Sequence, residues 1–329
     1  MFLSLFILSI LMTSKLKDII WWSPTKIKVA QSCLKKYYFE YILRDKIPIP
    51  SYFASGIFLH KRMESLYKGN FGNLELAFKS ADSFYKQSRA IWIRKIIKEG
   101  EIQGKKIAWK NKDEPWELIG LIKQICYQAY QRGLEEGPPL GTEIPIKFEF
   151  NGNFFNLRID EVRKGAVIRD HKTGKWSESD FELGYLTQLT MYALAISCKA
   201  HKDEAFSKVF GISNPEELGG NKYIISPEVE TQYYHMRSGN ISKTRRTDQH
   251  YYELKESLDD LESRIRSGLF PVNRQECGRC IHQKVCDQNS SAVIYPKIEN
   301  AQLNLFPVIK RTKERTKQIP LRFYKARKV

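Results

Sequence analysis

The spacing of apolar residues predicts helices toward both ends of the chain and strands between them. Ser23 and Pro24 are typical of a helix start, and apolar residues then recur at near-helical spacing, which predicts one helix over 23–46. The same spacing predicts helices over residues 56–67, 73–99, 115–135, 179–198 and 247–266. Alternation of apolar and polar residues predicts strands over residues 143–150, 154–162, 166–172, 223–225 and 232–236. Helices before and after a group of strands predict a mixed α/β fold.

The composition is that of a globular protein with a strong positive charge. Of 329 residues, 42% are hydrophobic and 28% are charged, which excludes a collagen, a coiled coil or a wholly disordered chain. This length allows one large domain or two modest ones. The 54 Lys and Arg residues outnumber the 37 Asp and Glu residues, so the net charge is +17. A field of this sign attracts polyanions such as nucleic acid, an acidic membrane or an acidic protein.

Residues 1–12 are apolar but do not predict a membrane protein. No stretch of the chain reaches the roughly 18 apolar residues that a bilayer span needs. The segment also lacks the basic start and the small-residue cleavage site of a signal peptide, so we expect it to pack on the core, with a short uncleaved anchor as the alternative. Six cysteines in a chain of this length do not form a disulfide-rich scaffold. We therefore expect a cytoplasmic protein without stable membrane insertion.

Two aspartates and a lysine are placed to form a catalytic group. Asp170 and Lys172 lie two residues apart near the end of a predicted strand, so their side chains project from one face. A turn centred on Gly165 would put Asp160 opposite Asp170, with Cβ atoms about 4.5–5.5 Å apart. Carboxylates this close repel each other unless a cation lies between them, and Mg²⁺ binds such pairs. The alternative is a solvated charged hairpin, which is the commoner meaning of so short a pattern.

Three further residues strengthen the prediction of a catalytic group. Gln188 and Tyr192 lie one turn apart on the following predicted helix, so both can reach the lysine or a phosphate from one helical face. His60 lies just inside the helix predicted from Gly56 and can supply a nitrogen ligand, although a lone histidine is more often structural. Beside a metal, Lys172 would hold or deprotonate an attacking water.

Three closely spaced cysteines predict a metal centre. Cys277, Cys280 and Cys286 fall within ten residues and need a fourth ligand to complete a zinc site or an iron–sulfur cluster. His282, inside the same segment, is one candidate for the fourth position. The remaining cysteines, Cys33, Cys126 and Cys198, lie on predicted helices, and the last two are on apolar faces that predict buried thiols.

The order of these motifs resembles the PD-(D/E)XK nucleases. The match is to their RecB-like branch with an iron–sulfur cluster, which includes the AddB nuclease domain and the CRISPR-associated RecB-like exonucleases. The resemblance runs from about Ser23 to Asp287, which is most of the chain. It is carried by Ser23-Pro24, Cys33-x4-Tyr38-Phe39, Gly56-x3-His60, Arg158-Ile159-Asp160, Asp170-x-Lys172-Thr173-Gly174, Gln188-x3-Tyr192 and Cys277-x2-Cys280-x5-Cys286. Each motif alone is weak, and their common order carries the resemblance.

The resemblance implies a fold and a set of metal ligands. The fold is a restriction-endonuclease-like α/β core, a mixed central sheet flanked by helices, with a helical insertion and an iron–sulfur staple. The implied ligands of Mg²⁺ or Mn²⁺ are His60, Asp160, Asp170 and the backbone carbonyl of His171. Lys172 is then catalytic, with support from Gln188 and Tyr192, which also contact DNA. The implied 4Fe–4S ligands are Cys33, Cys277, Cys280 and Cys286, with zinc as the alternative occupant.

Two positions qualify this resemblance. Leu157 stands where the family usually has a glycine three residues before the first aspartate, which would alter how closely DNA approaches. Glu143 lies on the preceding strand, where relatives often carry an acidic residue, and it is a weaker site candidate.

The resemblance also implies a function. It predicts a metal-dependent DNA exonuclease that hydrolyses phosphodiester bonds, on single-stranded ends, in replication, recombination or repair. The alternatives are a CRISPR-associated nuclease of spacer acquisition and a non-catalytic DNA-binding module. We expect an apolar segment over 1–22, a nuclease domain over 23–290 and a tail over 291–329. The residues of the first helix expected to guide the strand by stacking and charge are Lys35, Lys36, Tyr37 and Tyr38.

The tail carries a short peptide and a run of positive charge. The peptide residues Gln302, Leu303, Leu305 and Phe306 resemble the segment by which bacterial replication and repair proteins bind the sliding clamp. A peptide that packs back on the core is the alternative. Residues 307–329 hold nine Lys or Arg and one Glu, and we expect them to hold nucleic-acid phosphates and to make affinity depend on salt. A helicase is a further candidate partner.

Overall fold

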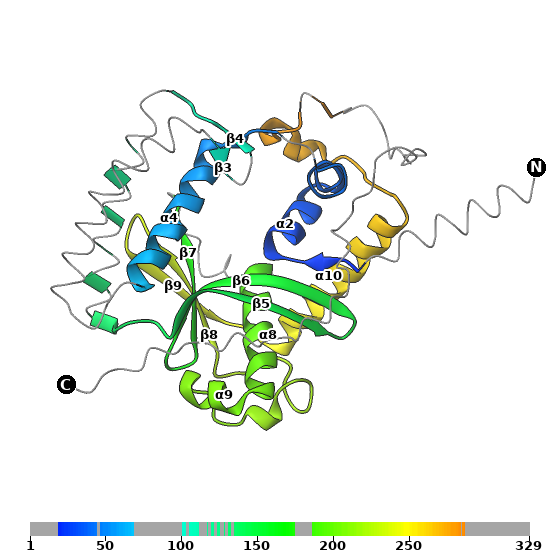
Figure 1. The fold of residues 1–329 in the computed structure, drawn as a ribbon. Coiled ribbons are helices and arrows are strands. Elements are labelled where there is room, and N and C mark those ends of the chain that lie inside the picture. The colour runs from blue at the N-terminus through cyan, green and yellow to red at the C-terminus, as the bar shows by residue number, and fades with distance from the viewer. Residues whose placement is uncertain are drawn as a thin grey trace, which may run out of the picture. The chain divides into compact units, whose positions relative to one another are not determined.

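The computed structural model describes residues 19–44, 47–68, 101–102, 105–111, 135–174, 186–283 and 285–286, together with scattered positions between 117 and 132 (Figure 1). The described positions between 117 and 136 are helical, in agreement with the predicted helix. The predicted helix over 73–99, Cys126, residues 1–18 and the tail with its clamp-like peptide lie outside the described residues. Among the described helices, none combines the length and the apolar character that crossing a bilayer requires.

The chain divides into two compact units. Among the described residues, the first unit combines those of 19–44, Ile146–Leu157 and those of 252–286. The second unit combines those of 47–145 and 158–251. Each unit is therefore assembled from segments that are distant in sequence.

A mixed sheet forms the centre of the second unit. Strands β6 (Asn153–Arg163, from Arg158 in this unit), β7 (Val167–Lys172), β8 (Glu230–His235) and β9 (Asn240–Arg245) pair in this order, first antiparallel, then parallel, then antiparallel. Strand β5 (Gly141–Phe150) also pairs with β6. The turn between β6 and β7 contains Gly165 with φ of 76°, a backbone conformation that favours glycine. The pairing runs from Arg163 opposite Val167 to Glu161 opposite Arg169, so Asp160 and Asp170 are the next residues beyond it on the two strands.

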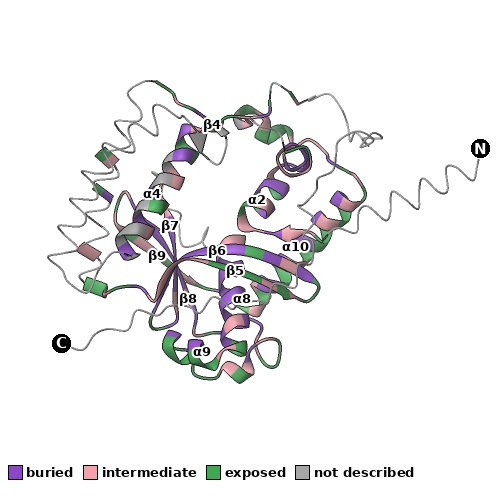
Figure 2. Cartoon of the chain, in the orientation of Figure 1, coloured by how far each residue is buried: buried purple, intermediate pink, exposed green. Residues whose placement is uncertain are grey.

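Helices cover both faces of this sheet. α4 (Ser51–Lys68) packs Leu59 and Met63 against Tyr234 of β8 in one buried cluster. α8 (Thr187–Lys202) lies on the other face and is buried along most of its length, which is typical of a core helix (Figure 2). Side chains alternate along a strand, so β7 directs Asp170 and Lys172 toward α8, and His171 toward α4.

Smaller elements complete the second unit. α9 (Glu204–Phe210) follows α8 and is capped at its start by Asp203, whose carboxylate accepts the Phe206 N–H at 2.9 Å. A three-stranded sheet of β2 (Ile49–Pro50), β4 (Lys105–Ala108) and β3 (Glu101–Ile102) pairs in that order and adjoins the start of α4.

The first unit joins both ends of the described chain. β1 (Trp21–Trp22) pairs parallel to Phe154 and Phe155 of β6. α2 (Pro24–Ser32) begins where predicted, with the Ser23 hydroxyl accepting the Lys26 N–H at 3.2 Å. α10 (Asp248–Arg266, from Tyr252 in this unit) and a short 3₁₀ helix (Arg274–Arg279) supply the C-terminal part.

The prediction of one continuous helix over 23–46 is wrong in one respect, because the helix is broken at Cys33. Cys33 is extended, with φ of −166° and ψ of 114°, and its backbone N–H bonds to Val29 at the end of α2. A short helix, α3 (Leu34–Tyr37), and a π-helical turn (Tyr38–Ile42) follow. Hydrophobic periodicity cannot reveal this break, since the apolar spacing continues through it.

Two strand predictions also differ from the structure. The predicted strand over 223–225 is irregular, because the Ile224 and Ile225 N–H groups donate to Asp248 Oδ1, at 3.0 and 2.8 Å, instead of to a neighbouring strand. The edge strand β9 was not predicted, since its sequence is largely polar and most of its side chains are partly or fully exposed. The described part of the helix predicted over 179–198 begins at Thr187, because residues 175–185 lie outside the described residues.

Candidate active site

Asp170 and Lys172 meet side by side at the end of β7. Lys172 Nζ lies 2.9 Å from Asp170 Oδ2 and donates to Gln188 Oε1 at 2.8 Å. The ammonium also lies 4.4 Å from the centre of the Tyr233 ring. Lys172 therefore has a fixed position while its side chain is still 29% exposed, so it remains accessible to a substrate.

Gln188 and Tyr192 hold Asp170 from α8. Gln188 Nε2 donates to Asp170 Oδ1 at 2.7 Å and to the Tyr192 hydroxyl at 2.9 Å, and that hydroxyl donates to Asp170 Oδ1 at 3.3 Å. The i, i+4 spacing predicted from the sequence thus brings both side chains to one carboxylate. Gln188 also bonds to Lys172, so one amide fixes the acid and the amine together.

Asp160 lies on β6 beside the same group. Its Oδ2 accepts the backbone N–H of His171 at 2.8 Å, and its Oδ1 lies 3.4 Å from His60 Nδ1. Burial tends to raise the pKa of the Asp160 carboxyl, but the positive charge of His60 outweighs it and lowers the pKa. In Asp170, burial and the negative charge of Asp160 together raise the pKa, against the opposing effect of Lys172. The pKa of Asp160 is therefore lowered and that of Asp170 is raised, although the two carboxyls are neighbours.

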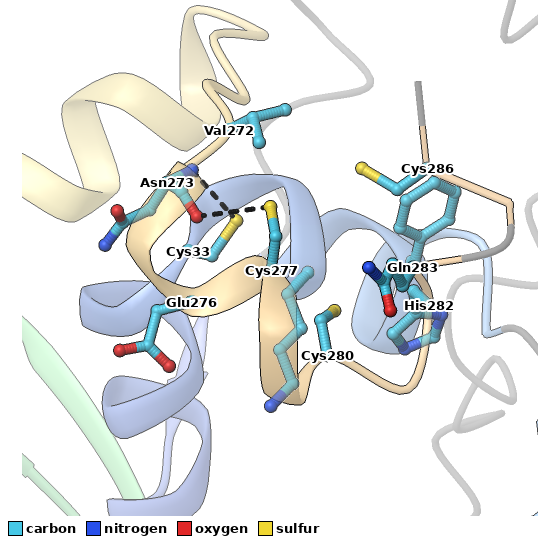
Figure 3. A pocket seen from close by; sticks show the side chains of 11 residues that line it. Cys33, Val272, Asn273, Glu276, Cys277, Cys280, His282, Gln283 and Cys286 are labelled. Atoms are coloured by element: carbon cyan, nitrogen blue, oxygen red, sulfur yellow. Dashed lines mark hydrogen bonds between the residues drawn. The ribbon is translucent and has the colours of Figure 1, made fainter. Parts of the chain in front are cut away.

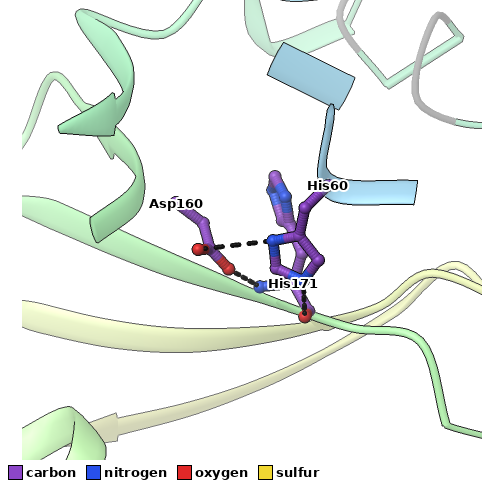
Figure 4. A group of neighbouring side chains, drawn as sticks. All are labelled: His60, Asp160 and His171. Carbon is purple, nitrogen blue, oxygen red and sulfur yellow. Dashed lines mark hydrogen bonds and ion pairs between the residues drawn. The ribbon is translucent and has the colours of Figure 1, made fainter. Parts of the chain in front are cut away.

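His60 of α4 joins Asp160 to the backbone of β7 (Figure 4). Its Nε2 lies 3.1 Å from the His171 carbonyl oxygen, and its Nδ1 lies 3.4 Å from Glu143 Oε1. Burial lowers the pKa of His60, but Asp160 and Glu143 outweigh this effect and raise it well above its ordinary value. Glu143, which also lies 3.6 Å from Arg158, contacts His60 without contacting Asp170.

The donor set fits a hard divalent cation. A side-chain ligand atom of each of His60, Asp160 and His171 lies within 4.8 Å of the other two, and the His171 carbonyl oxygen lies 3.1 Å from His60 Nε2. Asp170 Oδ2 is buried and accepts no well-aligned hydrogen bond from the described residues, although Lys172 lies beside it. Carboxylate and carbonyl oxygens with one imidazole suit Mg²⁺ or Mn²⁺. A divalent cation between the carboxylates would also cancel the repulsion that raises the Asp170 pKa.

A buried ionic network, which the sequence pattern does not indicate, lies behind this site on the α4 face of the sheet. Glu161 is fully buried and pairs with Arg163, with Arg169 at 3.4 Å and with His171 Nε2 at 2.8 Å. Arg169 in turn bonds to Glu136 at 2.8 Å. The signal in the sequence is the pairing of opposite charges across the hairpin, Glu161 against Arg169, which becomes visible only once the register is known. The network fixes His171, whose backbone holds Asp160 and His60.

The four predicted cysteine ligands surround one small cavity (Figure 3). Its volume is about 30 Å³, and its lining includes Cys33, Cys277, Cys280 and Cys286. Asn273 donates its N–H to Cys33 Sγ at 3.4 Å, and Cys277 Sγ donates to the Asn273 carbonyl at 3.6 Å. Four thiols that line one cavity suit an inorganic group held by thiolates.

Cationic side chains accompany the thiols. Burial raises the pKa of Cys280 and of Cys286, while Lys36 lowers the former and Lys35 lowers the latter. Lys35 is 1% exposed, an extreme burial for an ammonium group. His282 also lines the cavity, but its ring stacks on Phe39 with centroids 5.1 Å apart, and its Nε2 lies 3.5 Å from Glu40.

The prediction that the first helix guides nucleic acid by stacking and charge is wrong for Tyr37, Tyr38 and Lys35, whereas for Lys36, whose side chain is 27% exposed, it stays a prediction. Tyr37 and Tyr38 are 3% and 6% exposed, and Lys35 is equally buried, so none of them presents a surface to a strand. Tyr38 packs against Phe270 with ring centroids 4.9 Å apart. These residues support the cysteine site because α3 follows directly after Cys33. Cys198 is buried as predicted, and burial raises its pKa to about 11.

Comparison with known protein families identifies the family of the chain. A family model described as the PD-(D/E)XK nuclease superfamily matches residues 21–287, which is well over half of the chain. No curated protein matches the sequence. The matched range includes every residue of the Asp170 site and all four cysteines of the cavity.

Proposed function

Because the chain belongs to the PD-(D/E)XK nuclease superfamily, whose members are generally metal-dependent nucleases, we propose that it is a metal-dependent DNA exonuclease acting on single-stranded ends. The observation that supports this most is the convergence of Asp160, Asp170 and Lys172 at one end of the β6–β7 hairpin. Nucleic acid as the substrate class also agrees with the net charge of +17.

Each residue of the site has a distinct role in this proposal. His60, Asp160, Asp170 and the His171 carbonyl hold Mg²⁺ or Mn²⁺. When bound, the metal supplies a Lewis acid for the scissile phosphate and favours deprotonation of water. Lys172 orients the attacking water and balances charge that develops on the phosphate oxygens. Gln188 keeps Lys172 and Asp170 in their relative positions, Tyr192 supports Asp170, and Glu143 orients His60.

The decisive experiment replaces one carboxylate. Purified protein with Mn²⁺ is given a single-stranded oligonucleotide labelled at one end, and Asp170→Asn is compared with Asp259→Asn, an exposed acid on α10. Since the bound metal supplies several kcal/mol and each 1.36 kcal/mol is tenfold in rate, we expect Asp170→Asn to lose at least about a hundredfold of activity. Asp259→Asn should match the wild type. Full activity in Asp170→Asn would contradict the proposed site.

A circular substrate tests the requirement for ends. An exonuclease leaves single-stranded circles intact while it degrades the same sequence after linearisation. Cleavage of the circle at a rate similar to that of the linear strand would replace the exonuclease proposal with an endonuclease. Duplex DNA with blunt ends, assayed in parallel, tests the preference for single strands.

We also propose that the cysteine cavity holds a 4Fe–4S cluster, as in the RecB-like branch. Four thiols around one compact cavity, with Lys35 and Lys36 nearby, suit an anionic four-thiolate centre. Zinc bound by the same thiols is the alternative. Anaerobically purified protein should be brown and contain about four iron atoms per chain. Stoichiometric zinc without iron would contradict the cluster.

The pathway and the partners are proposals from the sequence. The clamp-like peptide over 302–306 favours replication or repair over CRISPR adaptation, and we propose a cytoplasmic location for either role. A peptide covering this segment should bind a bacterial sliding clamp, and replacement of Leu305 and Phe306 by alanine should abolish that binding. No binding of the wild-type peptide would remove this support for a replication or repair role.

A further inference from the structure

Two exposed aromatic side chains stand at the start of α4. Tyr52 is 58% exposed and Phe53 is 53% exposed, and their rings lie against each other with centroids 4.8 Å apart and planes inclined by 32°. Tyr67, near the other end of the same helix, is buried. An exposed aromatic pair offers a flat surface of the size of a nucleobase.

The pair lies on the helix that also carries His60. Phe53 and His60 are seven residues apart, so they share one helical face and lie about 10.5 Å apart along the axis. Gly56 lies between them on that face and presents no side chain. A Cβ at Gly56 would stand 3.4 Å from Thr173 Oγ1, so this part of α4 approaches the segment that follows Lys172. A strand at the metal ligands therefore lies within reach of Phe53.

Positive charge accompanies the aromatic pair. β2 immediately precedes α4 and pairs with β4, with Pro50 opposite Ala108. Lys106 on β4 and Lys110 just after it are both exposed. Aromatic rings next to exposed lysines are the combination that proteins use to bind single-stranded nucleic acid, with bases on the rings and phosphates on the ammonium groups.

We propose that Tyr52 and Phe53 form a stacking platform for unpaired bases next to the scissile phosphate, with Lys106 and Lys110 holding the neighbouring backbone. This proposal rests on the proposed nuclease function and identifies the residues that would determine its specificity for single strands. A base inside a duplex has both faces covered by its neighbours, whereas an unpaired base can stack on a ring. The platform therefore discriminates single strands from duplex before any bond is cut.

The test measures binding, so that it does not depend on cleavage. In an Asp170→Asn background, a fluorescent single-stranded oligonucleotide and the corresponding duplex are titrated against the Tyr52→Ala/Phe53→Ala variant and against Tyr252→Ala. Tyr252 is an exposed aromatic residue of α10 and serves as the matched control. Loss of stacking should weaken single-strand binding roughly 5- to 150-fold, and duplex binding far less. Tyr252→Ala should leave both unchanged.

Two further variants separate stacking from charge and from loss of fold. Tyr52→Phe/Phe53→Tyr keeps both rings and should retain single-strand affinity. Lys106→Ala/Lys110→Ala should lower the slope of log affinity against log salt by about 0.7 for each phosphate that the protein no longer neutralises. Quenching of a 2-aminopurine base near the cut should disappear in the alanine pair and persist in the lysine pair.

Several outcomes would overturn the platform. These are unchanged single-strand affinity in a folded alanine pair, an equal loss for single strand and duplex, or a change from dimer to monomer, which would mark the pair as an interface between copies. Failure of the proposed nuclease function gives a different result, since wild-type protein would then show no cleavage with Mn²⁺ whatever the binding data. The two proposals can therefore fail separately.

Discussion

Replacing Glu161 by Gln tests whether the buried ionic network holds the active site in place. Glu161 is 0% exposed, and its two carboxylate oxygens are shared among Arg163, Arg169 and His171. Glutamine has nearly the same shape but no charge, and only one of its terminal atoms accepts hydrogen bonds. Glu161→Gln therefore removes the negative charge that balances two arginines and leaves the packing nearly unchanged.

The pKa of Glu161 gives the magnitude. Burial alone would raise this pKa, but the hydrogen bond and charge of His171 and the charges of Arg169 and Arg163 lower it from 4.5 to about 2. At 1.36 kcal/mol per pKa unit, the ionised group contributes about 3 kcal/mol to the free energy of unfolding. Because the pKa is lower in the folded state, this contribution is complete above pH 4.5. It is lost progressively as the pH falls from 4.5 to about 2.

Urea unfolding at several pH values is the appropriate assay. At pH 7 we expect Glu161→Gln to be less stable than the wild type by about 3 kcal/mol. The difference should be the same at pH 5 and smaller by about 1 kcal/mol at pH 3.5. Glu149→Gln, an exposed glutamate on β5, is the control and should stay within about 0.5 kcal/mol of the wild type. A difference at pH 7 no larger than that of the control, or one that does not shrink at pH 3.5, would refute the reasoning.

The same variant has a consequence for the metal. His171 shares a side-chain hydrogen bond with Glu161 and uses its backbone N–H and carbonyl to hold Asp160 and His60. Loss of a residue that orients ligands typically costs 10- to 100-fold in metal affinity. We therefore expect Mn²⁺ affinity, measured by calorimetry at pH 7, to fall by about this factor in Glu161→Gln, and to be unchanged in Glu149→Gln.

Three further predictions concern the two metal sites. Because burial and the charge of Asp160 raise the pKa of Asp170 above its ordinary value of 3.8, protons compete with a cation for this carboxyl up to a higher pH than at a free aspartate, so Mn²⁺ affinity should still rise with pH above 3.8; a flat profile in calorimetry would contradict this. Cys33→Ser should reduce the iron or zinc retained per chain and lower the melting temperature of the loaded protein, whereas Cys198→Ser should leave metal content unchanged. Lys35→Met removes a buried charge beside the thiols, so it should speed metal loss to a chelator without lowering the melting temperature of the metal-free protein; equal destabilisation of both forms would show only a packing role.

The sequence predicts the parts of the fold that depend on local pattern. The β6–β7 hairpin follows from alternation and a glycine turn, and its register brings Asp160 near Asp170. α8 follows from helical periodicity, and the i, i+4 spacing brings Gln188 and Tyr192 to one carboxylate. Patterns of this kind suffice because each is set by neighbours within one or two turns of chain.

Other features depend on distant partners and escaped prediction. The irregular segment at Ile224 is decided by Asp248, which is 24 residues away. The exposure of Tyr52 and Phe53 and the burial of Tyr37 and Tyr38 are indistinguishable in sequence, since both pairs are aromatic residues of amphipathic helices. Glu161 and Arg169 likewise resemble solvated charges until the sheet pairs them. In each case the missing information is tertiary packing.

The alternation of side chains along β7 also protects against misfolding. If β7 slipped by one position against its neighbours, every side chain would change faces. Arg169 and His171 would then face α8, where Gln188 and Tyr192 bind Asp170 and Lys172 in the native register. Asp170 and Lys172 would face α4, where Glu161 pairs with Arg169 and His171 in the native register. Neither exchange leaves the buried ions compensated, so the slipped hairpin would be strongly disfavoured. The buried charges that form the active site and the ionic network therefore also disfavour a slipped, inactive register during folding.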